Sequence, residues 1–128
     1  MKNMQGVTVL VVDDEPDLRD LLAYEFEEMG CTVIQAESGR DGARVFDSKT
    51  IDVVVSDIRM PGGSGLDLLD HVRNHINGVM PPFFLITGFA DVSEEQAMEK
   101  GARRLFHKPF DIDEIMNAVK NAVHSTAA

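Results

Sequence analysis

The stretch that decides the fold is Ile51-Asp52-Val53-Val54-Val55-Ser56-Asp57-Ile58-Arg59-Met60-Pro61-Gly62. Its first half is apolar and β-branched, a pattern that predicts a buried strand. The strand ends in a single carboxylate, Asp57, followed by a loop that contains proline and glycine. A carboxylate in this position is either a turn residue or part of a functional site, and a site would need partners elsewhere in the chain.

The length and composition of the chain are those of one globular domain. It has 128 residues, of which 44% are hydrophobic and 27% are charged, and a chain of about 130 residues can bury one sizeable core. We therefore expect a single domain over residues 1–128, with a core over about 6–124. The only cysteine, Cys31, cannot form an intrachain disulfide.

The charge and hydropathy of the chain limit its partners. The net charge is −10, from 12 basic and 22 acidic residues, and such a surface repels nucleic acid and anionic membranes. No apolar run approaches the length of about 18 residues that a membrane-spanning helix needs. Residues 1–6 lack the apolar stretch of a signal peptide. We expect no direct contact with nucleic acid or membrane, and a cytoplasmic location by default.

Strand-like and helix-like segments alternate along the chain. In addition to the opening stretch, strands are predicted at residues 7–12, 31–36, 83–87 and 104–107. Helices are predicted at residues 16–29, 39–48 and 65–73, between residues 93 and 101, and after residue 111. Successive strand–helix units of this kind predict an α/β fold, a doubly wound parallel sheet with helices on both faces.

Polar residues stand where four of the predicted strands end. Ligands bind at the carboxyl ends of the strands in an open parallel sheet, so these side chains should gather at one edge. They are Asp13 and Asp14 after the first strand, Asp57 at the end of the third, Thr87 at the end of the fourth, where Gly88 follows, and Lys108 after the fifth.

The residue types in this group suit phosphoryl transfer. Three carboxylates that close repel one another unless a cation lies between them, and hard oxygen ligands favour Mg²⁺. Asp57 suits the role of nucleophile, which would form an aspartyl-phosphate. Lys108 supplies a compact cation for one oxygen of the transferred group, and Thr87 can donate a hydrogen bond to another.

Each of these residues alone also has an ordinary structural interpretation. An Asp-Asp pair before proline commonly begins a helix, and Asp57 alone could stabilise a turn. Thr87 could be an ordinary strand residue, and Lys108 an exposed lysine. Their coincidence at the same ends of different strands favours a site.

At these positions the sequence resembles the receiver domain of bacterial two-component response regulators, whose small prototype is the chemotaxis switch protein. Each matching segment alone is weak evidence, whereas the set is highly specific because it occurs in the same order across nearly the whole chain. The segments are Val11-Val12-Asp13-Asp14-Glu15, Asp57-Ile58-Arg59-Met60-Pro61-Gly62 with Gly65, Thr87-Gly88, and Lys108-Pro109-Phe110.

The resemblance implies a flavodoxin-like sheet with strand order 2-1-3-4-5 and five helices. It implies that Asp57 accepts a phosphoryl group from a phosphohistidine on a sensor histidine kinase or a phosphotransfer protein. Lys108, Thr87 and Gly88 would then bind the phosphoryl group. The phosphorylated surface would act on a downstream protein partner or form a phosphorylation-dependent dimer.

The resemblance also implies a set of metal ligands. Mg²⁺, or Mn²⁺ in its place, would be bound by Asp14, Asp57 and the backbone carbonyl of Arg59, with Asp13 acting through water. A cis peptide bond before Pro109 would help to aim Lys108.

The chain departs from the family pattern at the position that usually works with the threonine in switching. This residue, three before the lysine, is commonly Tyr or Phe in the family and is Leu105 here. Phe106 should point to the opposite face of the sheet and is therefore no easy substitute. Arg59 and Phe89 are both bulky and follow Asp57 and Thr87 by two positions. We expect this pair to flank the phosphoryl group and shield it from water.

Two other functions use similar residues. One is a Mg²⁺-dependent phosphohydrolase with an aspartyl-phosphate intermediate, but enzymes of the haloacid dehalogenase type carry Asp-x-Asp, and here Ile58-Arg59 follow Asp57. The other is a receiver-like scaffold that is never phosphorylated, which the complete set of Asp57, Thr87 and Lys108 disfavours. We expect a switch that catalyses its own phosphorylation and dephosphorylation, and no turnover enzyme.

Overall fold

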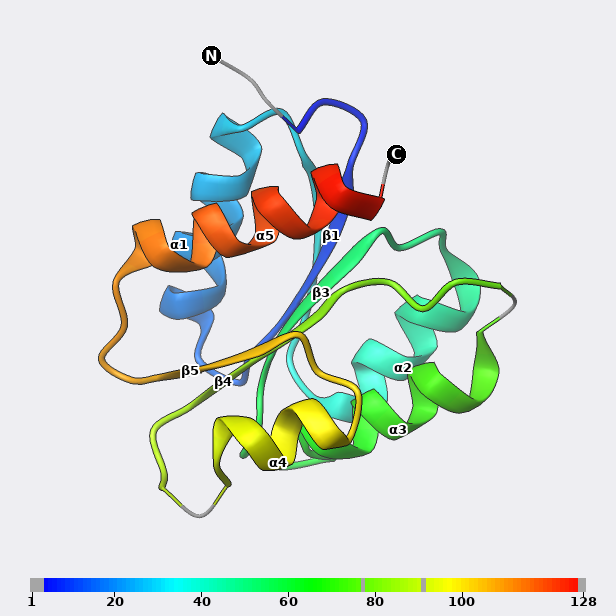
Figure 1. Cartoon of the computed structure of the whole chain (residues 1–128), viewed down its shortest axis with the longest axis vertical. Helices are drawn as coiled ribbons and strands as arrows, with labels where there is room; N and C mark the ends of the chain where they lie inside the picture. The colour runs from blue at the N-terminus through cyan, green and yellow to red at the C-terminus, as the bar shows by residue number, and fades with distance from the viewer. Residues whose placement is uncertain (1–3, 77, 91, 127–128) are drawn as a thin grey trace.

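The computed structural model describes residues 4–76, 78–90 and 92–126, and strands and helices alternate in it (Figure 1). The strands are β1 (Thr8–Val12), β2 (Thr32–Ala36), β3 (Val53–Asp57), β4 (Phe83–Thr87) and β5 (Arg104–His107). The helices are α1 (Pro16–Glu28), α2 (Gly39–Ser48), α3 (Gly65–His75), α4 (Glu94–Glu99) and α5 (Ile112–Thr126).

The strands form one parallel sheet in the order β2-β1-β3-β4-β5, which confirms the expected strand order and fold class. Helices α1 and α5 cover one face of the sheet, and α2, α3 and α4 cover the other (Figure 1). Val11 of β1 is in register with Gln35 of β2 on one side and Val55 of β3 on the other. The strands that lead to Asp13 and Asp57 are therefore direct neighbours inside the sheet.

The sheet divides the interior into two apolar cores because successive strand residues point to opposite faces. The core toward α1 and α5 includes Val9, Val11, Val53, Val55, Leu22, Phe26, Ile115 and Val119. The core toward α2, α3 and α4 includes Leu10, Val12, Val54, Leu68, Leu69, Val72 and Ala97. Because the central strands are buried on both faces, they hold the residues at their carboxyl ends in fixed positions.

Some predicted boundaries differ from the observed ones by one or two residues. Val7 and Cys31 lie just outside β1 and β2. The Cys31 N–H donates to the carbonyl of Phe26 at 3.1 Å, within the turn that ends α1. Helix α3 continues to His75, whose Nδ1 lies 2.8 Å from the carbonyl of His71 in the last turn.

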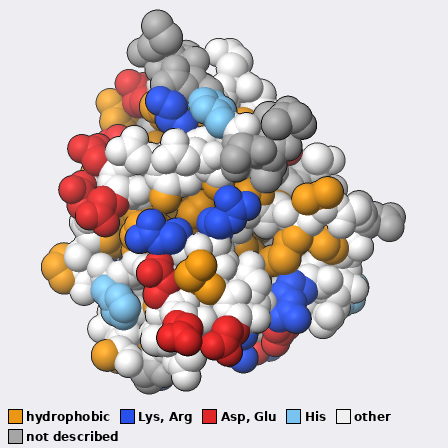
Figure 2. Space-filling model, viewed as in Figure 1, with side chains coloured by type: hydrophobic (Ala, Val, Ile, Leu, Met, Phe, Trp, Pro, Cys, Tyr) orange, Lys and Arg blue, Asp and Glu red, His pale blue; other side chains and the backbone are white. Residues whose placement is uncertain are grey.

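The face formed by α5, β5 and α4 carries charges of both signs. Basic side chains lie between α5 and α4, with acidic side chains over α4 (Figure 2). Arg103 and Arg104 near the edge strand, and Glu95 and Glu99 in α4, are exposed. Among the described residues, none of the helices has the length and apolar character needed to cross a membrane.

Candidate functional site

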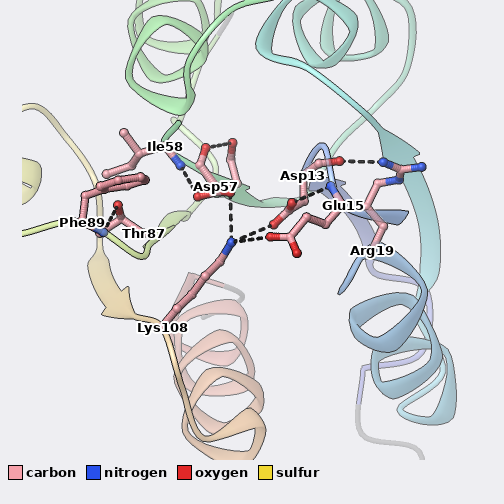
Figure 3. A network of polar contacts seen from close by, with 9 residues as sticks. Asp13, Glu15, Arg19, Asp57, Ile58, Thr87, Phe89 and Lys108 are labelled. Carbon is pink, nitrogen blue, oxygen red and sulfur yellow. Dashed lines mark hydrogen bonds and ion pairs between the residues drawn. The ribbon is translucent and has the colours of Figure 1, made fainter. Parts of the chain in front are cut away.

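Three carboxylates surround one ammonium group at the carboxyl edge of the sheet (Figure 3). Lys108 Nζ lies 3.1 Å from Asp57 Oδ2 and 3.1 Å from Glu15 Oε1. Its distance to Asp13 Oδ2 is 3.7 Å. The peptide bond between Lys108 and Pro109 is cis, as the resemblance implies. The fold thus brings the ends of β1, β3 and β5 to one point.

Asp57 is fixed by the backbone around it. Its side chain is almost fully buried, and Oδ1 accepts a hydrogen bond from the Ile58 N–H at 2.8 Å. Its main-chain carbonyl accepts one from the Ser56 hydroxyl at 2.8 Å. A Cβ at Gly65 would lie only 2.1 Å from that carbonyl oxygen, so the start of α3 can approach only with glycine there. These contacts leave Oδ2 of Asp57 directed at Lys108.

The loop between β1 and α1 is held in a similar way. Asp13 is 1% exposed, and its Oδ1 accepts a hydrogen bond from the Glu15 N–H at 2.9 Å. Its carbonyl accepts one from Arg19 Nη1 at 2.7 Å (Figure 3). Asp14, the next residue, is exposed. The buried and the exposed member of the acidic pair therefore have different surroundings.

The loop that follows Asp57 is also bonded to the beginning of α2. The Gly39 N–H donates to the Gly63 carbonyl at 2.9 Å, and the Arg40 N–H donates to the Gly62 carbonyl at 3.2 Å. A Cβ at Gly39 would lie 2.6 Å from the carbonyl oxygen of Ser64. The two backbones approach this closely because position 39 has no side chain.

Burial and charge shift the acidity of the central groups. Burial raises the pKa of Asp13 to about 6; the Glu15 N–H and Lys108 oppose this rise, and the charge of Asp57 adds to it. Burial also raises the pKa of Asp57, against the hydrogen bond from Lys108. Although burial alone would lower it, the hydrogen bonds to Asp57 and Glu15 raise the pKa of Lys108 above its ordinary value. One lysine thus offsets only part of the negative charge.

The donor set fits a hard divalent cation. Asp13, Asp14, Glu15 and Asp57 each offer a carboxylate oxygen, and these oxygens lie within 4.8 Å of one another. The Oδ2 atom of Asp13 is buried and accepts no hydrogen bond from the residues that the structure describes. A cluster of oxygen ligands with one buried, unsatisfied acceptor is what Mg²⁺ would stabilise.

The end of β4 borders the same edge. Thr87 is buried, and its Oγ1 accepts a hydrogen bond from the Phe89 N–H at 3.1 Å. The guanidinium carbon of Arg59 lies 4.5 Å from the centroid of the Phe89 ring, within the range of a cation–π contact. Gly88 is exposed, and a Cβ there would reach the Lys108 side chain at an ordinary 3.8 Å.

Leu105 and Phe106 lie on opposite faces of β5, as strand alternation predicts. Leu105 is buried in the core that faces α4, and Phe106 is buried in the core that faces α5. The Leu105 N–H donates to Glu94 Oε2 at 3.1 Å, and Arg104 Nε donates to the same oxygen at 2.6 Å. The start of α4 is therefore tied to the edge strand beside the position where the family usually has an aromatic ring.

Three residues shape this site in ways that the sequence did not predict. Glu15 carries a signal, because it follows the acidic pair directly, but its place before Pro16 favours a role in beginning α1. Arg19 and Gly65 act through backbone carbonyls, and the sequence pattern contains no sign of those contacts. Glu15 and Gly65 both lie in the segments that resemble the family, so these two could have been included among the expected site residues.

Comparison with known proteins agrees with the geometry. The model of the response regulator receiver domain family matches residues 9–120. The chain belongs to this family. Receiver domains are switches of two-component signal transduction and receive phosphoryl groups from histidine kinases.

This receiver domain also has curated relatives. It is 37% identical over 121 residues to the DNA-binding transcriptional regulator NtrC of Escherichia coli K12, in an alignment that covers 94% of this chain and 25% of NtrC. The chain thus spans about a quarter of the length of such relatives.

Two solved structures superpose closely on the receiver domain. The receiver domain of the Francisella response regulator 1452 has a TM-score of 0.85 at 27% identity, covering 94% of this chain and 99% of that one. The response regulator TrrA of Thermotoga maritima, solved in complex with Mg²⁺-BeF, has a TM-score of 0.80 at 33% identity, covering 91% and 98%. Both likenesses agree with the five-stranded flavodoxin-like architecture.

Proposed function

We propose that Asp57 accepts a phosphoryl group from a phosphohistidine on a sensor histidine kinase or phosphotransfer protein. The observation that carries this proposal is the 3.1 Å contact between Lys108 Nζ and Asp57 Oδ2, which joins a buried carboxylate to a cation at the carboxyl edge of a parallel sheet. A carboxylate oxygen of Asp57 attacks phosphorus, and the bond between phosphorus and the histidine nitrogen breaks.

The residues around Asp57 divide the work of stabilising the transferred group. Its negative charge is spread over three oxygens in the transition state. Lys108 pairs with one of these oxygens. The hydroxyl of Thr87 and the backbone N–H of Gly88 donate hydrogen bonds to the others. Thr87 Oγ1 accepts a hydrogen bond from the Phe89 N–H, and because a hydroxyl can accept and donate at the same time, its O–H can donate to the phosphoryl group. This pair of bonds would couple phosphorylation to the loop after β4.

We assign the cation site to Asp14, Asp57 and the backbone carbonyl of Arg59, with Asp13 bound through water. When bound, Mg²⁺, or Mn²⁺ in its place, neutralises charge on the carboxylates and on the transferred phosphoryl group. The unsatisfied buried oxygen of Asp13 supports this assignment. The related response regulator TrrA was solved in complex with Mg²⁺-BeF, which is consistent with the same choice of ion.

Arg59 and Phe89 form a bulky pair next to Thr87. Arg59 lies over the Phe89 ring at 4.5 Å, and Phe89 is tied to Thr87 through its backbone N–H. We propose that the pair excludes water from the phosphoryl group and so prolongs its lifetime on Asp57.

The test is covalent labelling followed by intact-mass measurement. Wild-type protein incubated with acetyl phosphate and Mg²⁺ should gain one phosphoryl group, and Asp57→Asn should gain none. Asp113→Asn, an exposed position on α5, is the matched control and should label normally. Labelling that persists in Asp57→Asn would contradict the assignment. A wild-type protein that takes up no phosphoryl group would favour the unphosphorylated scaffold.

We propose a switch and no turnover enzyme. Position 59, where a haloacid dehalogenase-type hydrolase has its second carboxylate, is Arg59. Rapid multiple turnover of a phosphate ester would contradict the switch. The cytoplasmic location and the single domain over residues 1–128 stay predictions.

The output is proposed to be a protein interaction. The net charge of −10 disfavours direct binding of nucleic acid; the DNA-binding description belongs to full-length NtrC, of which this chain matches a quarter. A pull-down that compares phosphorylated protein with Asp57→Asn identifies the partner. Size measurement on the same two samples tests a phosphorylation-dependent dimer.

A further inference from the structure

Glu15 touches both sides of the candidate site. It precedes α1, and its backbone N–H donates to Asp13 Oδ1 at 2.9 Å. Its side chain crosses to Lys108, where Oε1 accepts a hydrogen bond from Nζ at 3.1 Å (Figure 3). The side chain is 63% exposed, so the apolar core does not fix it in place. None of the roles assigned above requires this contact.

The three acidic partners of Lys108 differ in how firmly they are held. Asp57 and Asp13 each have Oδ1 fixed by a backbone N–H and present only Oδ2 to the ammonium. A lysine ammonium has three N–H donors. Two of them are used by Asp57 and Glu15, and the third side faces the Asp13 oxygen at 3.7 Å. Two of the three donors of Lys108 are thus bound to carboxylates, and the one bonded to Glu15 lies on the side of the β1–α1 loop.

We propose that Glu15 is a positioning residue that restrains Lys108 in the resting domain and slows phosphorylation of Asp57. Its carboxylate draws the ammonium toward the loop between β1 and α1. That contact must be released before Lys108 can pair with a phosphoryl oxygen. The negative charge of Glu15 also repels an anionic phosphodonor. The inference rests on the proposed phosphorylation of Asp57 and adds to it a residue that opposes the forward step.

The restraint should be modest and sensitive to salt. Exposed ion pairs are weak, so removing the Glu15 charge should speed phosphorylation by about two- to fivefold. Salt screens contacts between exposed charges. The advantage of the variant should therefore shrink at high ionic strength.

The first measurement addresses phosphorylation. Rate constants for labelling by acetyl phosphate are compared between wild type, Glu15→Gln, Glu15→Asp and Glu28→Gln. Glu28→Gln removes the same charge from an exposed position at the far end of α1. Saturating Mg²⁺ removes any difference in cation affinity. Glu15→Gln should be faster than Glu28→Gln. Glu15→Asp should also be faster than wild type, because its shorter side chain keeps the charge but loses reach.

The second measurement addresses Lys108 without phosphorylation or metal. Competitive acylation of lysines, read by peptide mass spectrometry, reports how firmly each ammonium is held. Glu15→Gln should raise the reactivity of Lys108 by about two- to fivefold, with Lys49 and Lys100 as internal standards on exposed surface.

The outcomes separate the restraint from the proposed function. Unchanged Lys108 reactivity in Glu15→Gln would overturn the restraint. So would normal labelling at equal rates in Glu15→Gln and Glu28→Gln, or a Glu15→Asp variant that labels like wild type. Wild-type protein that takes up no phosphoryl group would instead overturn the proposed function and the kinetic half of the inference, and the lysine reactivity would still show whether Glu15 holds Lys108.

Discussion

The Oδ2 atom of Asp13 lies 3.7 Å from the ammonium of Lys108 and, among the described residues, accepts no hydrogen bond. Its partner oxygen is satisfied by a backbone N–H. Burial therefore acts on a half-satisfied carboxylate and raises its pKa to about 6. Because the pKa of Asp13 is higher in the folded than in the unfolded protein, ionising this carboxyl lowers the stability of the folded state.

Replacing Asp13 should stabilise the metal-free protein at neutral pH. The folded pKa of about 6 compares with an ordinary value of 3.8; at 1.36 kcal/mol per unit, ionised Asp13 costs up to about 3 kcal/mol above pH 6. The unfolded state loses its proton near pH 4, so this cost grows between about pH 4 and 6. Asp13→Asn should thus be more stable than wild type at about pH 7.5, with no gain near pH 4.

Urea unfolding without divalent cations, at both pH values, measures this difference. Asp14→Asn is the control, because it removes an exposed charge from the neighbouring position. An Asp13→Asn variant that is less stable than wild type at neutral pH would contradict the account.

Gly65→Ala should distort the site from outside it. The added Cβ would lie 2.1 Å from the carbonyl oxygen of Asp57, and either α3 or the end of β3 must move. We expect a loss of about 1–3 kcal/mol in unfolding free energy, together with slower labelling by acetyl phosphate. Gly88→Ala is the stability control, because its Cβ meets Lys108 at an ordinary 3.8 Å. Equal stability of the two variants would contradict this prediction, because it would show that the end of β3 can move away from the added Cβ without a loss of stability.

Removing the Arg59–Phe89 pair should shorten the life of the phosphorylated form. The guanidinium lies over the ring at 4.5 Å, and we propose that together they cover the side of the site next to Thr87. Without that cover, water reaches the phosphoryl group more easily. The decay rate of phosphorylated Arg59→Asn with Phe89→Ala should exceed that of wild type, and an unchanged rate would rule out shielding.

Glu94 should hold α4 against β5. Its Oε2 accepts from Arg104 and from the Leu105 N–H, and the hydrogen bond from Arg104 holds the pKa of Glu94 below its ordinary 4.5. Since a lowered pKa favours the ionised folded form, the contact persists at neutral pH and is lost as pH falls through the folded pKa. Glu94→Ala should speed hydrogen exchange of the Leu105 amide by about two- to fivefold.

The matched control is Glu95→Ala, since Glu95 lies in the same first turn of α4 and is exposed. Both variants lose one favourable charge at the start of the helix, so any difference belongs to the contact with β5. Equal exchange rates of the Leu105 amide in the two variants would show that Glu94 does not hold α4 against β5.

The fold was predictable because its signals are local. The β-branched run before Asp57 marks a strand buried on both faces, and repeated strand–helix units leave one topology class. The convergence of Asp13, Asp57 and Lys108 follows from strand ends in a parallel sheet. The end of α3 at His75 was harder to predict from the sequence, since it involves a contact between the His75 side chain and the His71 carbonyl in the last turn.

Glu15 and Gly65 show where sequence reasoning stops. In the sequence, Glu15 looks like an ordinary acidic residue at the start of a helix. Its hydrogen bond from Lys108 Nζ is known only from the structure, because Lys108 reaches it across the edge of the sheet. Gly65 matters because of a backbone oxygen that lies 2.1 Å from a missing Cβ. Distances of this kind depend on how two segments meet in space, and residue types alone do not specify them.

The backbone contact between Gly39 and Gly63 has a genetic consequence. A side chain at position 39 would collide with the loop that follows Asp57, although the two segments are well separated in the sequence. A random mutagenesis screen for loss of signalling should therefore recover substitutions at Gly39 alongside those in the acidic cluster. Such alleles would resemble phosphorylation-site defects, and mapping them by sequence alone would assign them to the wrong part of the protein.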